Sequence, residues 1–358
     1  MSDDAETIVA REGRIGRLTL NRPQAIGALT TGMCRTMTAA LLEWLGDPAV
    51  EAVIIDHAGD RGFCAGGDVR TLADSAAGDG VAAREFFYVE YQLDHLISVY
   101  PKPIITVMDG LVMGGGVGIS LPAAYRIATE RTTFAMPETG IGLFPDVGAG
   151  WHLPRLHGRT GVWLALTGAR IRAADCELLG IATDIVPAAT LPTLKADIAA
   201  DPAGVERWLT EVEADAGRAP ISEHHDDIDR LFAGETVETI VAQLRADGSD
   251  WAREQLAIIA GKSPLSVKVA LRLMQRGAKA RSLAEDLAVE YRIASRVALS
   301  AEFREGVRAV IVDKDNAPRW RPGRLEEVTD AMVDDIFAPL SAHEEWKPLP
   351  EAAALGET

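Results

Sequence analysis

The chain has 358 residues, of which 47% are hydrophobic and 25% charged, a composition typical of a folded protein rather than a disordered one. Its formal net charge of −17 argues against nucleic acid as a partner, because no surplus of Lys and Arg is present to neutralise phosphates. An acidic total still allows an anionic small ligand, since a few local basic side chains can bind it.

Three cysteines, odd in number and without a CxxC pair, indicate reduced thiols and a cytoplasmic protein. The acidic start, Met1 to Glu6, lacks the basic-then-apolar pattern of a signal or transit peptide. The most apolar stretch, 104–122, is interrupted by Asp109, five glycines and Pro122. It is too polar to span a bilayer, so we expect no membrane association.

The first half of the chain shows short apolar segments that alternate with glycine-rich turns and helical spacing. A glycine-rich loop is expected at 59–68, and a short helix after the triplet at 114–116. Pro122 is tolerable in that helix only near its first turn, where its missing N–H is not needed. Strands are predicted at 7–10, 17–21, 53–55, 104–108, 127–128 and 133–136, and longer helices at 31–44 and 86–99.

From about residue 191 the pattern of apolar and polar residues changes, and long amphipathic segments dominate. These predict helices at 237–244, 251–259, 264–276 and 283–299. The chain therefore divides into an α/β part, 1–190, and a mainly helical part, 191–358.

Three segments contain glycines or acids of the kind that take part in catalysis. They are Phe-Cys-Ala-Gly-Gly-Asp at 63–68, Gly-Leu-Val-Met-Gly-Gly-Gly-Val-Gly at 110–118, and Phe-Ala-Met-Pro-Glu-Thr-Gly-Ile-Gly-Leu-Phe-Pro-Asp at 134–146. Glycines directly after a buried strand let a ligand approach the main chain and leave N–H groups free to bind it. Two such loops, facing each other, would stabilise an oxyanion, and a nearby carboxylate would act as base, nucleophile or hydroxyl acceptor.

Singly, each segment is more typical of an ordinary turn or helix start, but in order and spacing the three resemble the crotonase (enoyl-CoA hydratase/isomerase) superfamily. The resemblance is strongest to its 3-hydroxyisobutyryl-CoA hydrolase branch. It starts at Leu-Asn-Arg-Pro, 20–23, and ends at Phe-Arg-Glu-Gly-Val-Arg-Ala-Val, 303–310, and Asp-Lys-Asp, 313–315. It implies an α/β spiral of repeated strand–strand–helix units, with a helical C-terminal region that covers the pocket and forms homo-oligomers, most often trimers.

By this resemblance, the N–H groups of Gly67 and Gly115 form the oxyanion hole around the thioester carbonyl. Glu138 matches the catalytic glutamate, and Asp146 matches the acid that contacts the substrate's 3-hydroxyl. Glu90 matches another substrate-contacting acid. The implied reaction is hydrolysis of a short-chain 3-hydroxyacyl-CoA, chiefly 3-hydroxyisobutyryl-CoA in valine breakdown, without a cofactor or metal.

The resemblance also implies that Ala25, in the loop 22–28, and Asp68 line the CoA site. Gly27 stands where the family usually has Asn, so a looser loop is expected there. Gly118 stands where enoyl-CoA hydratases carry their second catalytic glutamate. Adding water across a double bond needs both an acid and a base, so this loss weakens the hydratase interpretation.

Several alternatives stay open at this point. Glu138 can activate water or attack the carbonyl itself to form a mixed anhydride. An enoyl-CoA hydratase or isomerase could use Asp146 as its second carboxylate, and a catalytically silent CoA-binding relative is disfavoured by the retained acids and glycines. The pair His224-His225 is interpreted as part of a solvated face rather than a metal site, and Cys64 as a packed side chain rather than a nucleophile.

Overall fold

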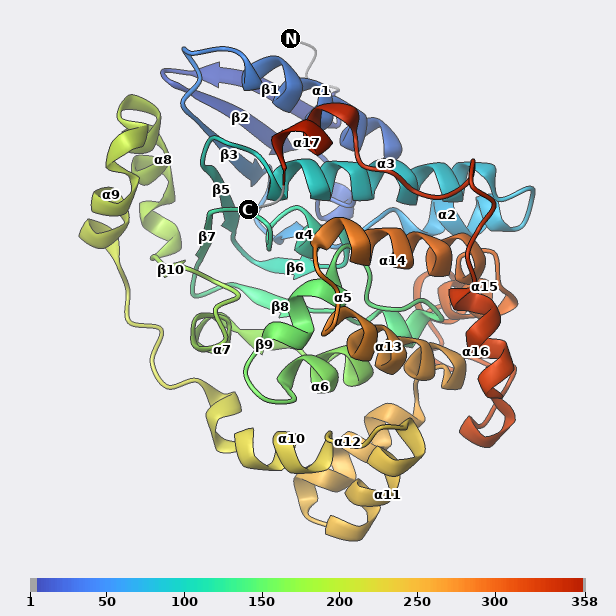
Figure 1. Ribbon diagram of the computed structural model, residues 1–358. Coiled ribbons are helices and arrows are strands. Elements are labelled where there is room, and N and C mark those ends of the chain that lie inside the picture. Colours follow the sequence, from blue (N-terminus) through green and yellow to red (C-terminus); the bar gives the residue numbers. More distant parts are fainter. Residues whose placement is uncertain (1–4, 357–358) are drawn as a thin grey trace.

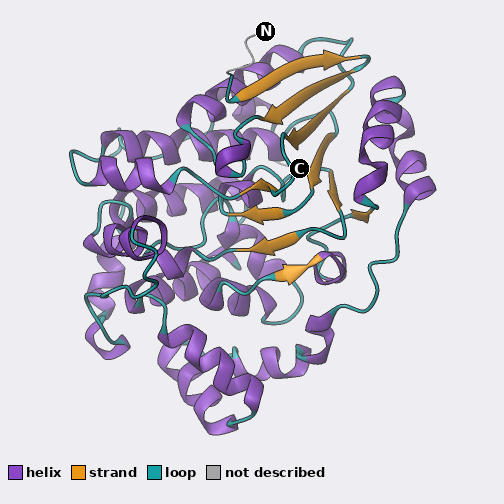
Figure 2. Ribbon diagram, turned by 180° about the vertical axis from the view of Figure 1, so that it is seen from behind, coloured by secondary structure: helices purple, strands orange, loops and turns teal. Residues whose placement is uncertain are grey.

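Residues 5–356 are described by the structure, a computed structural model, and their strands form two sheets (Figures 1 and 2). The larger sheet has the order β1-β2-β3-β5-β7-β10 and the smaller one β4-β6-β8-β9. The pairs β1–β2 and β8–β9 are antiparallel, and the other pairs are parallel. The strands are β1 (Thr7–Glu12), β2 (Ile15–Leu20), β3 (Ala52–His57), β4 (Gly62–Cys64), β5 (Ile104–Met108), β6 (Leu111–Met113), β7 (Tyr125–Ala128), β8 (Thr133–Ala135), β9 (Ile171–Arg172) and β10 (Asp184–Ile185).

The chain adds strands to the two sheets in turn. It places β3, β5 and β7 in the larger sheet, and each is followed by its successor, β4, β6 or β8, in the smaller one. Helical segments then lead back to the larger sheet. This is the predicted spiral of strand–strand–helix units, and the fold class is confirmed.

Helices of the first half are α1 (Thr31–Leu45), α2 (Val69–Ala76), α3 (Val81–Ser98), α4 (Gly115–Gly118), α5 (Ala149–His152), α6 (Thr160–Thr167) and α7 (Ala173–Leu178). Two sequence predictions were wrong. The predicted loop 59–68 contains β4, because a strand of three buried residues is too short to show alternation. The helix after the glycine triplet has four residues, so Pro122 lies beyond its end rather than in its first turn.

The second half is helical, as the sequence predicts. Its helices are α8 (Leu191–Ala200), α9 (Val205–Val212), α10 (His225–Leu231), α11 (Val237–Asp247), α12 (Asp250–Ala260), α13 (Pro264–Gly277), α14 (Leu283–Val297), α15 (Ala301–Val307), α16 (Asp330–Phe337) and α17 (Pro350–Leu355). Among the described helices, none combines the length and apolar character needed to cross a membrane.

Side-chain alternation in the larger sheet divides the core between its two faces. In β3, Val53 and Ile55 belong to the main core, whereas Ile54 packs in a smaller cluster with Leu194 and Ile198 of α8. The main core includes α13 and α14, and Figure 1 shows α14 alongside α3 and α13 close to α6. The helical half therefore packs against the first half, and the domain boundary near residue 190 stays a prediction.

Candidate active site

The three chemistry-bearing segments meet because they follow neighbouring strands of the smaller sheet. β6 lies between β4 and β8, and all three run parallel. Carboxyl ends of parallel strands share one edge of a sheet, so the segments after Cys64, Met113 and Ala135 converge there. A Cβ built on Gly66 would lie 3.6 Å from the Cα of Gly114. The two glycine loops therefore face each other, as predicted.

Two of these glycines keep the gap between the loops open. Gly114 has φ 48° and ψ −123°, a conformation that L side chains rarely adopt. A Cβ on Gly115 would lie 2.3 Å from Oε1 of Glu90. Within residues 5–356, the N–H groups of Gly67 and Gly115 donate no hydrogen bond. Both predicted oxyanion-hole donors are thus available at the rim of one cavity.

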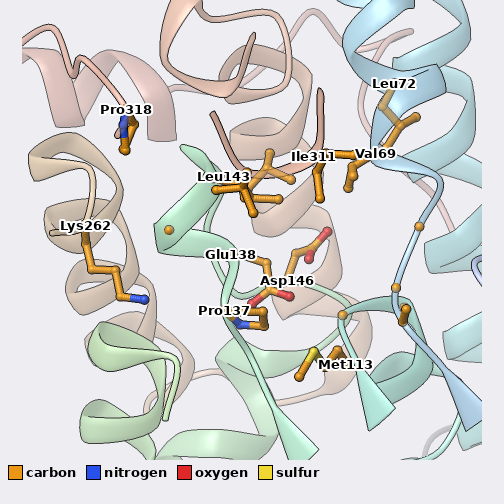
Figure 3. A pocket seen from close by; sticks show the side chains of 18 of the residues that line it. Val69, Leu72, Met113, Pro137, Glu138, Leu143, Asp146, Lys262, Ile311 and Pro318 are labelled. Carbon is orange, nitrogen blue, oxygen red and sulfur yellow. The ribbon is translucent and has the colours of Figure 1, made fainter. Parts of the chain in front are cut away.

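A cavity of about 640 Å³ opens at this edge (Figure 3). Its walls include Gly67 and Gly115 together with the acids Glu90, Glu138 and Asp146. The structure therefore brings together all five of these sequence-predicted residues. The C-terminal half completes the wall with Ala257, Ile258, Gly261, Lys262, Val310, Ile311, Asn316 and Pro318.

Glu138 and Asp146 lie side by side in the centre of the cavity (Figure 3). Each residue is 6% exposed. Tyr91 of α3 donates its hydroxyl hydrogen to Oδ2 of Asp146 at 2.7 Å. Oε2 of Glu138 is buried and has no hydrogen-bond partner in the described part of the chain. One acid is therefore anchored, and the other keeps an oxygen free for a ligand.

The environment makes both carboxyls weaker acids than usual. Burial, reinforced by the Asp146 carboxylate, raises the pKa of Glu138 well above its ordinary value, and Lys262 opposes this rise. Burial raises the pKa of Asp146 to about 6, against the hydrogen bond from Tyr91. Shifted acids of this kind, in a cavity, are typical of active sites.

Lys262 is a cavity residue that sequence reasoning missed. It follows α12 directly and reaches into the cavity toward Pro137 (Figure 3). Its ammonium group forms no ion pair or hydrogen bond with any described residue, and its pKa is lowered by burial, against the attraction of Glu138. A single Lys in a loop carries no sequence signal. Val310 at the end of the 303–310 motif, and Ile311 and Pro318 after it, also line the cavity.

Asp94, a second residue that sequence reasoning missed, occupies the space beside Gly118. A Cβ on Gly118 would lie 2.6 Å from Cβ of Val147 and 2.7 Å from Oδ2 of Asp94. Asp94 is fully buried, and neither of its carboxyl oxygens has a hydrogen bond within the described chain. It lies one turn beyond Glu90 on α3, the spacing that puts two side chains on one helix face. Gly118 thus leaves no room for a second catalytic glutamate.

Burial and neighbouring carboxylates raise the pKa values of both Glu90 and Asp94. Burial and then the Asp94 carboxylate raise the pKa of Glu90 well above its ordinary value. Burial and then Asp146 do the same for Asp94. Oε1 of Glu90 is also buried without a hydrogen-bond partner among residues 5–356. The charges of Glu90, Asp94, Glu138 and Asp146 therefore act on one another here, and Lys262 is the cation that acts on Glu138.

Ala25 and Asp68 lie in loops that adjoin the cavity but do not form its wall. Asp68 caps α2 and pairs with Arg22, whose Nη2 lies 2.9 Å from Oδ2. The N–H of Leu29 donates to the carbonyl of Gly66 at 2.8 Å, which ties the two loops together. Contact of Ala25 and Asp68 with CoA stays a prediction.

The expectation of a loose loop around Gly27 was wrong. Gly27 has φ 62°, and its N–H donates to the carbonyl of Arg22 at 3.0 Å. Arg22 in turn donates from Nη1 to the carbonyl of Ala28 at 2.7 Å. A Cβ at Gly27 would lie 2.3 Å from the carbonyl oxygen of Phe63. Glycine therefore allows close contact between loop and strand, and the loop is held firmly.

The structure gives no catalytic character to the thiol of Cys64 or to the pair His224 and His225. Burial raises the pKa of the Cys64 thiol to about 12, so the thiolate that a nucleophile needs is not available. His224 stacks on Trp251 with ring centroids 4.9 Å apart, and His225 stacks on His157. Within the described residues, no three His, Cys, Asp or Glu side chains form a metal-binding group.

Comparisons with known proteins agree with this geometry. Residues 15–337 match the family described as enoyl-CoA hydratase/isomerase. The mitochondrial 3-hydroxyisobutyryl-CoA hydrolase of Bos taurus is 42% identical over 349 residues, which cover 95% of this chain and 90% of the relative. The protein of the same name from Xenopus tropicalis is 41% identical over 346 residues, covering 94% and 90%.

A solved structure titled as a carnitinyl-CoA dehydratase from Mycobacterium thermoresistibile is also similar. It is 42% identical with a TM-score of 0.92, and the match covers 96% of this chain and 99% of that one. Fold, site and sequence agree, and the chain belongs to the enoyl-CoA hydratase/isomerase family.

Proposed function

We propose that the chain hydrolyses a short-chain 3-hydroxyacyl-CoA thioester, chiefly 3-hydroxyisobutyryl-CoA, to 3-hydroxyisobutyrate and CoA. The observation that carries this proposal is the position of Glu138. Its buried carboxyl lines the cavity and lies against Gly114, where a Cβ would be 3.2 Å from Oε1. A thioester carbonyl between the N–H groups of Gly67 and Gly115 would therefore present its carbon to this carboxylate.

Hydrolysis then needs only two kinds of group. The two N–H groups stabilise the negative charge that develops on the carbonyl oxygen, each contributing roughly 3 kcal/mol to lowering the barrier. Glu138 either takes a proton from the attacking water or attacks the carbonyl carbon itself to form a mixed anhydride. In both routes the carbon–sulfur bond breaks and CoA leaves as a thiolate, which takes up a proton. In the second route, water then cleaves the anhydride and regenerates Glu138.

Selection of the 3-hydroxyl group is proposed for Asp146, with Glu90 beside it. Tyr91 holds one oxygen of Asp146, and the carboxyl lies next to Glu138 in the cavity (Figure 3). A carboxylate in this position would accept a hydrogen bond from a hydroxyl on the carbon two bonds from the thioester carbonyl. A substrate without that hydroxyl would leave the second oxygen of Asp146 without a partner from the substrate, which disfavours its binding.

Enoyl-CoA hydration is the second candidate. Two adjacent carboxyls, Glu138 and Asp146, would serve as base and acid, and one similar structure is titled as a dehydratase. The space beside Gly118 argues against it, because no side chain fits where a second glutamate would project. The two reactions differ in whether free thiol appears.

Further properties belong to the same proposal. A role in valine breakdown follows from the substrate, and trimeric assembly from the family resemblance. The acyl-CoA thioester carries its own leaving group, so no cofactor is proposed, and dialysis against a chelator should leave the rate unchanged. The cytoplasmic location stays a prediction, since the names of the vertebrate relatives place those proteins in mitochondria.

The direct test replaces Glu138 by Gln, which keeps the shape and removes the carboxylate. Thiol release from 3-hydroxyisobutyryl-CoA should fall by roughly 10³-fold, because neither a base nor a nucleophile remains. Glu345→Gln is the matched control, since Glu345 pairs with Arg292 and does not line the cavity. Thiol release by Glu138→Gln at the rate of the unmodified protein would overturn the assignment.

A further inference from the structure

The backbone that follows Asp146 is in an uncommon conformation. Val147 has φ 55°, in the left-handed region that a β-branched residue rarely adopts, and Gly148 has φ 84°. Such a backbone persists only where the surrounding structure holds it. Val147 is buried, and the residues after it enter the short helix α5. Something outside the segment must therefore fix it.

Glu290 supplies this restraint from the opposite half of the chain. It lies in α14, is fully buried, and receives two backbone hydrogen bonds. The N–H of Gly148 donates to Oε2 at 2.8 Å, and the N–H of Gly150 donates to Oε1 at 3.0 Å. Both carboxyl oxygens thus hold the segment that begins at Asp146.

A second acid, Asp286, lies one turn earlier on α14 against the same segment. A Cβ on Gly150 would lie 2.5 Å from Oδ1 of Asp286, so glycine is needed for this approach. Burial and then Asp286 raise the pKa of Glu290 well above its ordinary value, while the two N–H donors oppose the rise. The charge of Asp146 also raises the pKa of Glu290, and the charge of Glu290 raises the pKa of Tyr91.

We propose that Glu290 is a positioning residue, which holds the 146–150 segment so that the Asp146 carboxyl stays oriented toward the substrate's 3-hydroxyl. The inference rests on the proposed function, in which Asp146 binds that hydroxyl. Tyr91 fixes the carboxyl itself, and Glu290 fixes the backbone that carries it. Through Glu290, the helical half of the chain sets the substrate selectivity of a site built on the first half.

Glu290→Gln tests this with two substrates, 3-hydroxyisobutyryl-CoA and isobutyryl-CoA, which lacks the hydroxyl. The amide has one acceptor oxygen instead of two, so one N–H loses its partner. The kcat/KM for the hydroxylated substrate should fall roughly 10- to 100-fold, the effect of leaving one buried N–H without a partner. The kcat/KM for isobutyryl-CoA should change far less, because Asp146 has no hydroxyl to bind there.

Glu345→Gln, on the Arg292 ion pair, is the matched control and should keep the ratio of the two kcat/KM values. If Glu290 had a merely structural role, the variant would lose kcat/KM for both substrates by the same factor and would also lose thermal stability. A folded Glu290→Gln protein with the original ratio would overturn the proposal. If the unmodified protein releases no thiol from 3-hydroxyisobutyryl-CoA, the proposed function fails instead.

Hydrogen exchange tests the positioning without any substrate. In the unmodified protein, the amides of Gly148 and Gly150 should exchange as slowly as those of α14, because Glu290 holds them. In Glu290→Gln, exchange should speed up in the 144–153 segment alone. Fast exchange at these two amides in the unmodified protein would overturn the proposal, even if the variant did not fold.

Discussion

Two groups of buried acids in this molecule have opposite surroundings. Asp56, on β3, is 1% exposed and meets two cations on Oδ2, with Nη2 of Arg17 and Nζ of Lys195 each at 2.7 Å. Thr19 donates to its other oxygen at 2.7 Å. The acids of the active site, Glu138 among them, form no ion pair within residues 5–356.

The pKa values of the two groups of acids therefore shift in opposite directions. The hydrogen bonds and charges of Arg17 and Lys195 outweigh burial and lower the pKa of Asp56 below its ordinary value. Burial dominates at Glu138 and Asp94 and raises their pKa values. A paired buried acid stabilises the fold at neutral pH. Unpaired buried acids cost stability, which is acceptable where a free carboxyl is needed for chemistry.

The largest effect on stability is expected from Asp56→Asn, which removes the paired buried acid. It leaves Arg17 and Lys195 without their counter-charge and should lower the free energy of unfolding by about 2 kcal/mol. A fully buried pair would lose roughly 3–5 kcal/mol, and the smaller value reflects the partial exposure of Arg17 and Lys195, 24% and 20%.

Urea unfolding at pH 7 measures this loss. Thiol release per folded molecule should stay unchanged, because Asp56 lies outside the cavity. An equally stable Asp56→Asn protein would show that pairing does not distinguish the two groups.

The pH dependence separates activity from stability. The proposed reaction needs ionised Glu138 and Asp146, and the pKa of Asp146 is raised to about 6. The kcat/KM should therefore rise by up to about tenfold per pH unit for each of the two groups on the acid side, and reach half its maximum at or above about pH 6. A rate that stays constant down to pH 4.5 would contradict the raised pKa values.

The contributions of Asp56 and of the active-site acids to stability should change with pH in opposite directions. A raised folded-state pKa favours the fold below the unfolded pKa, and this contribution is lost as pH rises through the folded pKa. The lowered pKa of Asp56 gives the reverse, with stability present above the unfolded pKa and lost as pH falls through the folded one.

Asp94→Asn gives the smallest effect and the cleanest contrast with Asp56→Asn. It removes an unpaired buried charge without changing shape, so the free energy of unfolding at pH 8 should rise by roughly 1 kcal/mol, because burial and the Asp146 carboxylate disfavour the charged form of Asp94. The gain should vanish below about pH 3, where the acid is protonated in both states. Thermal unfolding at both pH values measures it, and a loss of stability at pH 8 would contradict the account.

Much of the fold was predictable because its signals are local. The buried run at 104–108 is β5 with the same bounds, and the opening hairpin and α1 differ by one or two residues. The gathering of Gly67, Gly115 and Glu138 was predictable from the family motifs, and the parallel order of β4, β6 and β8 explains it. The roles of these residues stay predictions.

The rest could not be predicted, because it depends on contacts between distant parts of the chain. Glu290 lies 142 residues from the N–H of Gly148 that it binds, and nothing in its own helix marks it. Tyr91 and Lys262 likewise gain significance only when α3 and the loop after α12 reach the cavity. Gly118 appeared in the sequence as a lost acid, whereas the structure shows its space taken by Asp94.

The central claim is that Glu138 cleaves a thioester rather than hydrates a double bond. The most direct measurement incubates the protein with 3-hydroxyisobutyryl-CoA and with crotonyl-CoA in parallel, and follows free thiol and enoyl absorbance together. The account predicts thiol release from the hydroxyacyl substrate and unchanged enoyl absorbance with crotonyl-CoA. Loss of enoyl absorbance without free thiol would contradict it and would make Asp146 the second catalytic acid of a hydratase.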